Sequence, residues 1–132
     1  MSHVIEHIPK YYLLDTMDAF FNALKKNGRL ILRTPNMEAP CALSSLYVTL
    51  GHEYGFCGSN LKSLMHLGGF DNIQLHRLKL LQPTFKQKIG SAVRWFFLKY
   101  QMIKHHLFGV NNGGIFESEL VISGDRQDFP GF

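Results

Sequence analysis

The feature that most constrains the fold is the alternation of helical and extended apolar patterns along the 132 residues. From residue 10 to residue 26, apolar side chains recur at the spacing of an amphipathic helix, and Asn27-Gly28 ends this pattern after two lysines. The next segment, 29–34, is apolar through its centre, as in a strand that is covered on both faces. A helix followed directly by such a strand predicts a layered α/β domain.

The alternation continues to the end of the chain. We expect one or two helical turns within 43–50, a helix with Ser59 or Asn60 as its N-cap, a strand over 70–80, a long helix over 84–108 and a last strand over 119–123. The long helix is therefore inserted before the last strand of the sheet. The tail, from Asp125 to Phe132, is expected to fray.

With 45% hydrophobic and 18% charged residues the composition is typical of a globular protein, and residues 1–132 are either one domain or part of a larger one. The two cysteines, Cys41 and Cys57, are too few for a disulfide framework and lack metal-ligand spacing, which favours thiols in a reducing compartment. The first residues do not form a basic segment followed by an apolar one, so we expect a cytoplasmic protein, with membrane-peripheral contact as an open alternative.

Positive charge is concentrated in the second half of the chain. No acidic residue occurs between Asp71 and Glu117, whereas seven lysines and arginines do. The helix over 84–108 places apolar side chains within one arc, which leaves three interpretations: packing on the sheet, peripheral contact with an anionic membrane or lipid-linked substrate, or an oligomer contact. No nucleic-acid-binding motif accompanies the charge, so we do not expect a nucleic-acid partner.

Four segments occur in the order and at about the spacing of one enzyme family. They are Ser2–Pro9, with the sequence SHVIEHIP, Asn27–Asn36, His52–Phe56 and Leu61–Phe70. Together they resemble the C-terminal half of a class I S-adenosylmethionine-dependent methyltransferase of type 11 or 12. The turn before the second segment departs from the family pattern, because Lys26-Asn27-Gly28-Arg29 stands where Lys-Pro-Gly-Gly is usual.

The resemblance implies a partial Rossmann-like methyltransferase sheet, made of the fourth to seventh strands with an inserted helix before the last. It also implies methyl transfer from S-adenosylmethionine to an oxygen or nitrogen nucleophile on a small molecule, such as a sugar or a lipid-linked glycan. The family's glycine-rich first loop, GxGxG, does not occur in the sequence. We therefore expect a missing N-terminal half, weak cofactor binding by this chain alone, and either self-association or a partner that completes the domain.

The resemblance also assigns site residues. Ser2, His3 and Val4 would line one wall of the cofactor pocket, and His7 and His52 would act on the acceptor. Histidine suits the role of a base that removes the acceptor's proton, because its unperturbed pKa is about 6.5.

Structural roles are open for the same region. Glu6 would brace the loop, His7 would pack at the rim of the pocket, and Asn36 would either enter the pocket or form the turn after its strand. The whole chain would then be a non-catalytic methyltransferase-like module that binds a partner or a membrane.

Metal ligation is a weaker expectation. In some relatives Glu-x-x-Glu-His and a later histidine hold magnesium, and Glu6, His7 and His52 resemble that set, but His3 replaces the first acid. Imidazoles suit a softer ion better than magnesium, and the prediction is that no metal is bound. The segment His3–His7 also matches the inverted zinc-protease motif HxxEH, which requires a helix that Pro9 disfavours.

Overall fold

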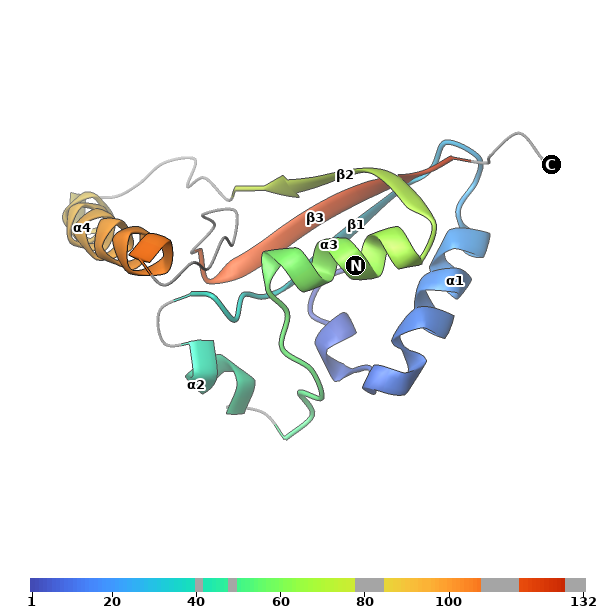
Figure 1. Cartoon of the computed structure of the whole chain (residues 1–132), viewed down its shortest axis with the longest axis horizontal. Helices are drawn as coiled ribbons and strands as arrows, with labels where there is room; N and C mark the ends of the chain where they lie inside the picture. Colours follow the sequence, from blue (N-terminus) through green and yellow to red (C-terminus); the bar gives the residue numbers. More distant parts are fainter. Residues whose placement is uncertain (40–41, 48–49, 78–84, 108–116, 128–132) are drawn as a thin grey trace.

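The structure, a computed structural model, describes residues 1–39, 42–47, 50–77, 85–107 and 117–127 (Figure 1). Its helical elements are the 3-10 turns η1 (Ile5–His7) and η2 (Lys10–Tyr12) and the α-helices α1 (Leu13–Ala23), α2 (Ala42–Tyr47), α3 (Gly58–Leu67) and α4 (Phe85–Leu107). Within these ranges, none of the helices combines the length and the apolar character needed to cross a bilayer.

The described strands form one antiparallel sheet, which is a layer of the α/β fold. They are β1 (Arg29–Pro35), β2 (Phe70–His76) and β3 (Glu119–Arg126), arranged in the order β1-β3-β2. The last strand of the chain therefore lies in the centre and is antiparallel to both neighbours, so that β1 and β2 run parallel to each other (Figure 1). The expected α/β class is confirmed, and α4 is inserted between β2 and β3 as predicted.

The first helix is shorter than the expected 10–26. Residues after Pro9 first form the 3-10 turn η2, in which Tyr12 N donates to Pro9 O at 2.8 Å, and the α-helix begins at Leu13. It ends at Ala23 because Leu24 is already extended, with φ −78° and ψ 144°. The predicted Asn27-Gly28 turn follows, with Asn27 at a φ of 59°, a conformation that asparagine tolerates better than most residues.

The N-terminus of α3 differs from the sequence expectation. Its N-cap is Cys57, and neither Ser59 nor Asn60 occupies that position. Asn60 lies at the third helical position, and its Oδ1 accepts a hydrogen bond from the Cys57 amide at 2.8 Å. This arrangement satisfies a backbone donor at the helix start, as in a capping box.

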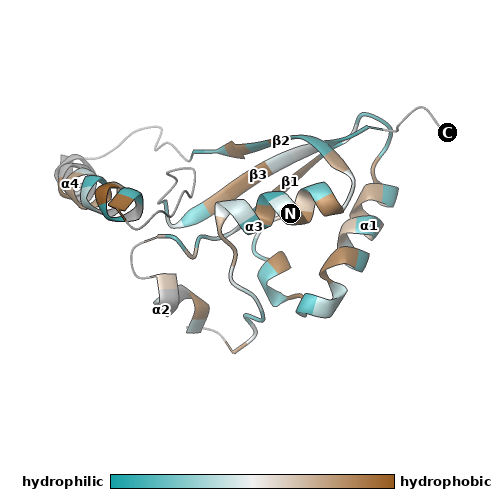
Figure 2. Ribbon diagram, viewed as in Figure 1, coloured by the Kyte–Doolittle hydropathy of each residue, from teal (hydrophilic) through white to brown (hydrophobic). Residues whose placement is uncertain are grey.

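The hydrophobic core lies on one face of the sheet. Its central residues are Leu32 from β1 and Leu120 and Ile122 from β3, all fully buried. Helices α1 and α3 cover these residues and contribute Leu13, Met17, Leu61, Leu64 and Met65. The core also contains Ile5, Phe56 and Phe70. Figure 2 shows the hydrophobic residues of α1 and α3 among hydrophilic ones, as expected for helices with one buried face.

The expectation that β1 is covered on both faces is wrong. Ile31, on the face opposite Leu32, is 51% exposed. On either side of Ile31, cross-strand ion pairs join Arg29 to Asp125 and Arg33 to Glu119. The apolar centre of β1 is thus buried on its helix-covered face only.

The expectation of a frayed tail from Asp125 is wrong for its first residues, because β3 extends to Arg126. The Arg126 guanidinium donates to the carbonyl oxygens of Phe21 at 3.0 Å and Leu24 at 2.6 Å, and its backbone amide bonds Gly28 O. These bonds join the end of β3 to the end of α1. The rest of the predicted tail from residue 128, and residues 78–80 of the predicted strand 70–80, lie outside the described residues.

Helix α4 lies beside the sheet and does not cover it (Figure 1). On this helix Phe96 is 71% exposed and Ile103 is 60% exposed. The interpretation in which the apolar arc packs on the sheet as core is therefore wrong for its described side chains.

Candidate functional site

The first residues of the chain lie along the outer edge of β1. Ser2 forms a parallel bridge with Arg33, the His3 amide donates to Arg33 O at 2.8 Å, and the Arg33 amide donates to Met1 O at 3.0 Å. Residues 1–3 thus occupy the place of a short parallel strand next to β1. Both segments run toward the same end of the sheet, where η1 and the segment after β1 begin.

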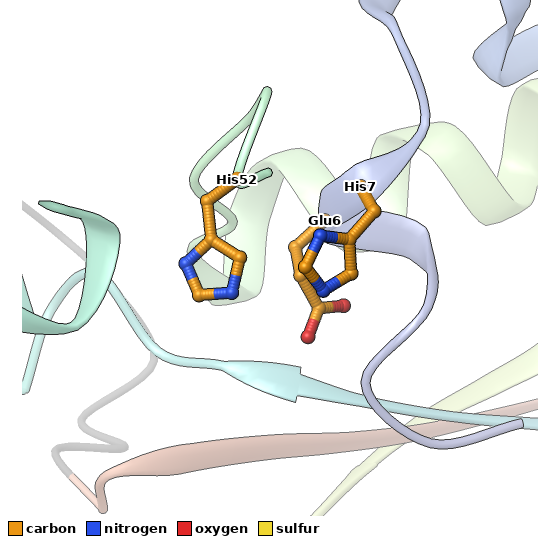
Figure 3. Close-up of side chains that lie close together, drawn as sticks. All are labelled: Glu6, His7 and His52. Carbon is orange, nitrogen blue, oxygen red and sulfur yellow. The ribbon is translucent and has the colours of Figure 1, made fainter. Parts of the chain in front are cut away.

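At this end three side chains from distant parts of the sequence come together. Glu6 and His7 come from η1, and His52 comes from the segment before α3 (Figure 3). The imidazole centroids of the two histidines are 4.8 Å apart, and one potential ligand atom from each of the three side chains lies within 4.8 Å of the others. The predicted pair His7 and His52 therefore lies together.

Glu6 connects the parts of this site. It is 2% exposed; its backbone oxygen accepts bonds from the amides of Glu53 at 2.8 Å and Tyr54 at 3.2 Å, and its Oε2 accepts one from Thr34 Oγ1 at 3.2 Å. This fixes the segment containing His52 against η1. Glu6 Oε1 is buried and accepts no hydrogen bond among the described residues, although it lies 3.3 Å from His3 Nδ1. Burying a carboxylate oxygen without a hydrogen bond costs free energy, which a bound ion or water can offset.

A hydrogen bond to the backbone of Gly51 orients the His7 ring and indicates which ring nitrogen carries the proton. Its Nδ1 lies 2.6 Å from Gly51 O, which can only accept a hydrogen bond, so Nδ1 is the protonated nitrogen. In the neutral ring this leaves the lone pair on Nε2. A Cβ at position 51 would lie 3.1 Å from His7 Nδ1, so glycine allows this close approach. The exposed His7 ring is thus oriented as a proton acceptor at Nε2.

His3 is not one of the three clustered side chains and has a left-handed φ of 52°. Its imidazole lies between two acids, with Nδ1 3.3 Å from Glu6 Oε1 and Nε2 3.3 Å from Glu119 Oε1. An inverted zinc-protease site would need His3 and His7 on one face of a helix, whereas η1 begins only at Ile5. The structure therefore does not form that site.

The three residues expected to line the cofactor pocket are exposed. Ser2, His3 and Val4 lie before η1, at the edge of β1, and Val4 is 44% exposed. Their assignment to a cofactor stays a prediction.

Asn36, at the end of β1, is 1% exposed and has a structural role. Its backbone amide donates to Ser118 O at 3.0 Å and its Nδ2 to Glu117 O at 2.8 Å, while its Oδ1 accepts from the Glu38 backbone amide at 3.0 Å. Asn36 thus links the segment after β1 to the start of β3, in agreement with the turn-forming interpretation.

The carboxyl group of the neighbouring Glu38 is partly buried. Burial raises the pKa of this carboxyl, although hydrogen bonds from the Gly58 amide and the Cys57 side chain act in the opposite direction.

Sequence reasoning missed three residues that hold the site: Thr34, which bonds Glu6; Gly51, which contacts His7; and Glu119, which pairs with His3 and Arg33. A signal for Thr34 existed, because it shares a strand face with Leu32, and a polar residue on a core face requires a buried partner. Gly51 and Glu119 had no such signal, because their partners are distant in the sequence. Gly51 is 44 residues from His7, and Glu119 is 86 residues from Arg33.

Comparison with known proteins agrees with this architecture. The chain is similar to the crystal structure of a SAM-dependent methyltransferase from Archaeoglobus fulgidus, with a TM-score of 0.62 over 95% of the chain and 15% sequence identity. The chain spans 57% of the length of that protein. No family model and no curated protein sequence matches the chain. The chain therefore shares its fold with part of the Archaeoglobus fulgidus protein.

Proposed function

We propose that this chain is part of an enzyme that transfers a methyl group from S-adenosylmethionine to an oxygen or nitrogen nucleophile. The observation that supports the activity best is the likeness to a SAM-dependent methyltransferase along 95% of the chain. A second observation supports the location of the acceptor: two histidines separated by 45 positions converge beside a buried carboxylate at one end of the sheet. The acceptor is a small molecule, for which a sugar or a lipid-linked glycan is our hypothesis.

Only one side of a cofactor site fits the residues of this chain. Ser2, His3 and Val4 are exposed beside β1 and available to contact a ligand, but the sequence has no GxGxG loop for close backbone approach to the cofactor. We therefore propose that a segment with that loop, in the same polypeptide or in a partner, completes the site next to residues 1–3. In that site the sheet would continue from β1 into the strands that are the fourth and earlier ones of the family.

In the proposed mechanism His7 is the base. The bound cofactor would supply an electrophilic methyl group. His7 accepts, at Nε2, the proton that the acceptor's hydroxyl or amine loses, and Gly51 O holds the ring through Nδ1. His52, whose ring lies 4.8 Å from that of His7, orients the acceptor or shares the proton. Glu6 fixes η1 and the segment of His52 as one unit.

The experiment is a methyl-transfer assay on a polypeptide that contains these residues and a GxGxG segment, with S-adenosylhomocysteine measured by mass spectrometry across alcohol, sugar and amine acceptors. Replacing His7 by Gln is expected to lower the rate about 10²- to 10⁴-fold, as for loss of a general base. His66→Gln is the matched control, because His66 is exposed on α3. An unchanged rate in His7→Gln would contradict the role of His7, and no product with any acceptor would favour the non-catalytic module.

The need for a second segment has its own test. Calorimetry of the 132-residue chain alone with S-adenosylmethionine is expected to show no micromolar binding. Micromolar binding would mean that Ser2, His3 and Val4, with the rest of this chain, suffice for the cofactor.

The same three side chains support a second candidate role, in which they bind a divalent transition-metal ion that polarises the acceptor. One buried carboxylate and two imidazoles form a ligand set that suits zinc better than magnesium. Metal analysis of the purified protein, followed by calorimetric titration of wild type and His52→Gln, tests it. Equal affinity for zinc in the two proteins would exclude this site.

A further inference from the structure

Helix α4 presents an apolar face that no described part of the chain covers. Its large side chains Val93, Phe96, Tyr100, Ile103 and Leu107 are between 60% and 75% exposed. No other described helix or strand packs extensively against α4, which lies to one side of the sheet (Figure 1). Such a continuous row of exposed apolar side chains is a mark of an interaction surface.

The described lysines border this face on both sides. In an α-helix a four-residue step rotates a side chain by about 40° around the axis, so Lys99 lies just beyond Ile103 on one side and Lys104 just beyond Tyr100 on the other. Both lysines are exposed. Trp95 lies on the same side of the helix as Lys99. The Lys99 ammonium group is 5.6 Å from the centroid of the Trp95 ring. Apolar residues between lysines, with an aromatic amphipathic residue at one border, are typical of a helix that lies in a membrane interface.

Charge distinguishes an anionic lipid surface from a second copy of the chain. Residues 72–116 contain seven lysines and arginines and no acid. In a symmetric dimer through α4 the same positive residues would face each other, with no acid of the helix to pair with them. A negatively charged bilayer pairs with the lysines and also accepts the apolar side chains.

We propose that α4 is a membrane-docking helix, which lies in the plane of an anionic lipid surface with Phe96, Tyr100 and Ile103 inserted below the headgroups. This surface is separate from the cluster of Glu6, His7 and His52, and the proposal does not depend on methyl transfer. It would bring the candidate site to substrates that are anchored in or near the membrane.

The first test is flotation of the 132-residue protein with phosphatidylcholine vesicles that contain or lack phosphatidylglycerol. We expect binding to the anionic vesicles, weakened by added salt because exposed charges are screened. The variant K99E/K104E is expected to lower the partition coefficient by roughly 30-fold or more, from about 1 kcal/mol for each lysine near an anionic surface. The matched control is K25E/K62E, which makes the same change in net charge at exposed lysines outside α4.

The orientation of the helix can be measured with tryptophan fluorescence, because the chain has one tryptophan. The variant W95F/F96W moves this reporter from the border of the apolar face to its interior. We expect anionic vesicles to shift the emission of Trp at position 96 further to the blue than that of the native Trp95. Replacing Ile103 by Ser, at a 60% exposed position, is expected to weaken vesicle binding more than tenfold and to leave the far-ultraviolet circular dichroism unchanged.

Three results would overturn the proposal. The first is equal loss of binding in K25E/K62E and K99E/K104E, which would indicate net charge and not α4. The second is a larger blue shift at position 95 than at position 96. The third is a lipid-independent dimer in analytical ultracentrifugation that I103S dissociates, which would identify a second copy as the occupant of the face.

Discussion

Replacement of Gly124 by Ala tests how β3 is packed against α3 and β2. A Cβ at this position would lie 2.6 Å from Met65 Cε and 3.1 Å from Phe70 Cβ. Ordinary contacts between carbon atoms are about 3.5–4.0 Å, so both neighbours would have to move. Met65 and Phe70 are fully buried, and the surrounding core limits that movement.

The magnitude follows from two opposing effects. Forcing one extra methyl group into a packed core costs about 1–3 kcal/mol. Removing the freedom of glycine from the unfolded chain returns about 0.5–1 kcal/mol. We therefore expect Gly124→Ala to lower the free energy of unfolding by about 1–2 kcal/mol, with a decrease in Tm of roughly 3–8 °C for a chain of this size.

The assay is urea unfolding followed by circular dichroism. Gly90→Ala is the control: a Cβ added to Gly90, which lies in α4, would meet no described atom of another element within 4 Å, so this variant is expected to be neutral or slightly more stable. A double mutant tests the contact itself. In the Gly124→Ala background, Met65→Ala should lower the free energy of unfolding by at least about 0.5 kcal/mol less than it does in wild type, because the smaller side chain makes room for the methyl group. Interaction energies between contacting residues are about 0.5–3 kcal/mol. A Gly124→Ala protein as stable as wild type would refute this description of the core.

Two further perturbations have defined outcomes. Hydrogen bonds from Arg29, the larger cause, and from Asn72 lower the pKa of the Asp125 carboxyl to about 2, from about 3.9 in the unfolded chain. The ionised Asp125 therefore stabilises the fold above pH 4, and this contribution is lost as the pH falls through about 2. Unfolding of Asp125→Asn in urea should therefore depend less on pH between 4 and 2 than that of wild type, and equal slopes would contradict the ion pair. Thr34→Val removes the hydrogen bond to buried Glu6 Oε2 and is expected to cost about 1–3 kcal/mol in the same urea assay, whereas Thr34→Ser should retain most of the stability.

Much of the local structure could be predicted from the sequence. The strand β1, the helical turn over 42–47, the helix α3 and the long helix α4 all lie where apolar periodicity and turn residues indicated. These features depend on neighbours within a few positions, which the sequence displays directly. The positions of His7 and His52 were inferred from a family resemblance, and the structure brings them together at one end of the sheet.

What failed depended on partners distant in the sequence. Ile31 continues an apolar run, yet its face of β1 is open and bordered by ion pairs, which no local pattern distinguishes from a buried face. Arg126 is ordered at the end of β3, where its guanidinium donates hydrogen bonds to carbonyl oxygens at the end of α1. These acceptors lie more than 100 residues earlier in the sequence. A charged residue near a chain end gives no sign of such a contact.

The sequence by itself determined where helices and strands form, because the spacing of apolar side chains and the turn at Asn27-Gly28 act through local backbone geometry. Only the tertiary structure decided which faces are buried, that β3 lies between β1 and β2, and that Gly51 O orients His7. It also decided that the apolar face of α4 remains exposed. These outcomes depend on which surfaces pack against each other. A side chain is buried only when a segment that is distant in the sequence covers it, so its own type and neighbours do not determine its burial.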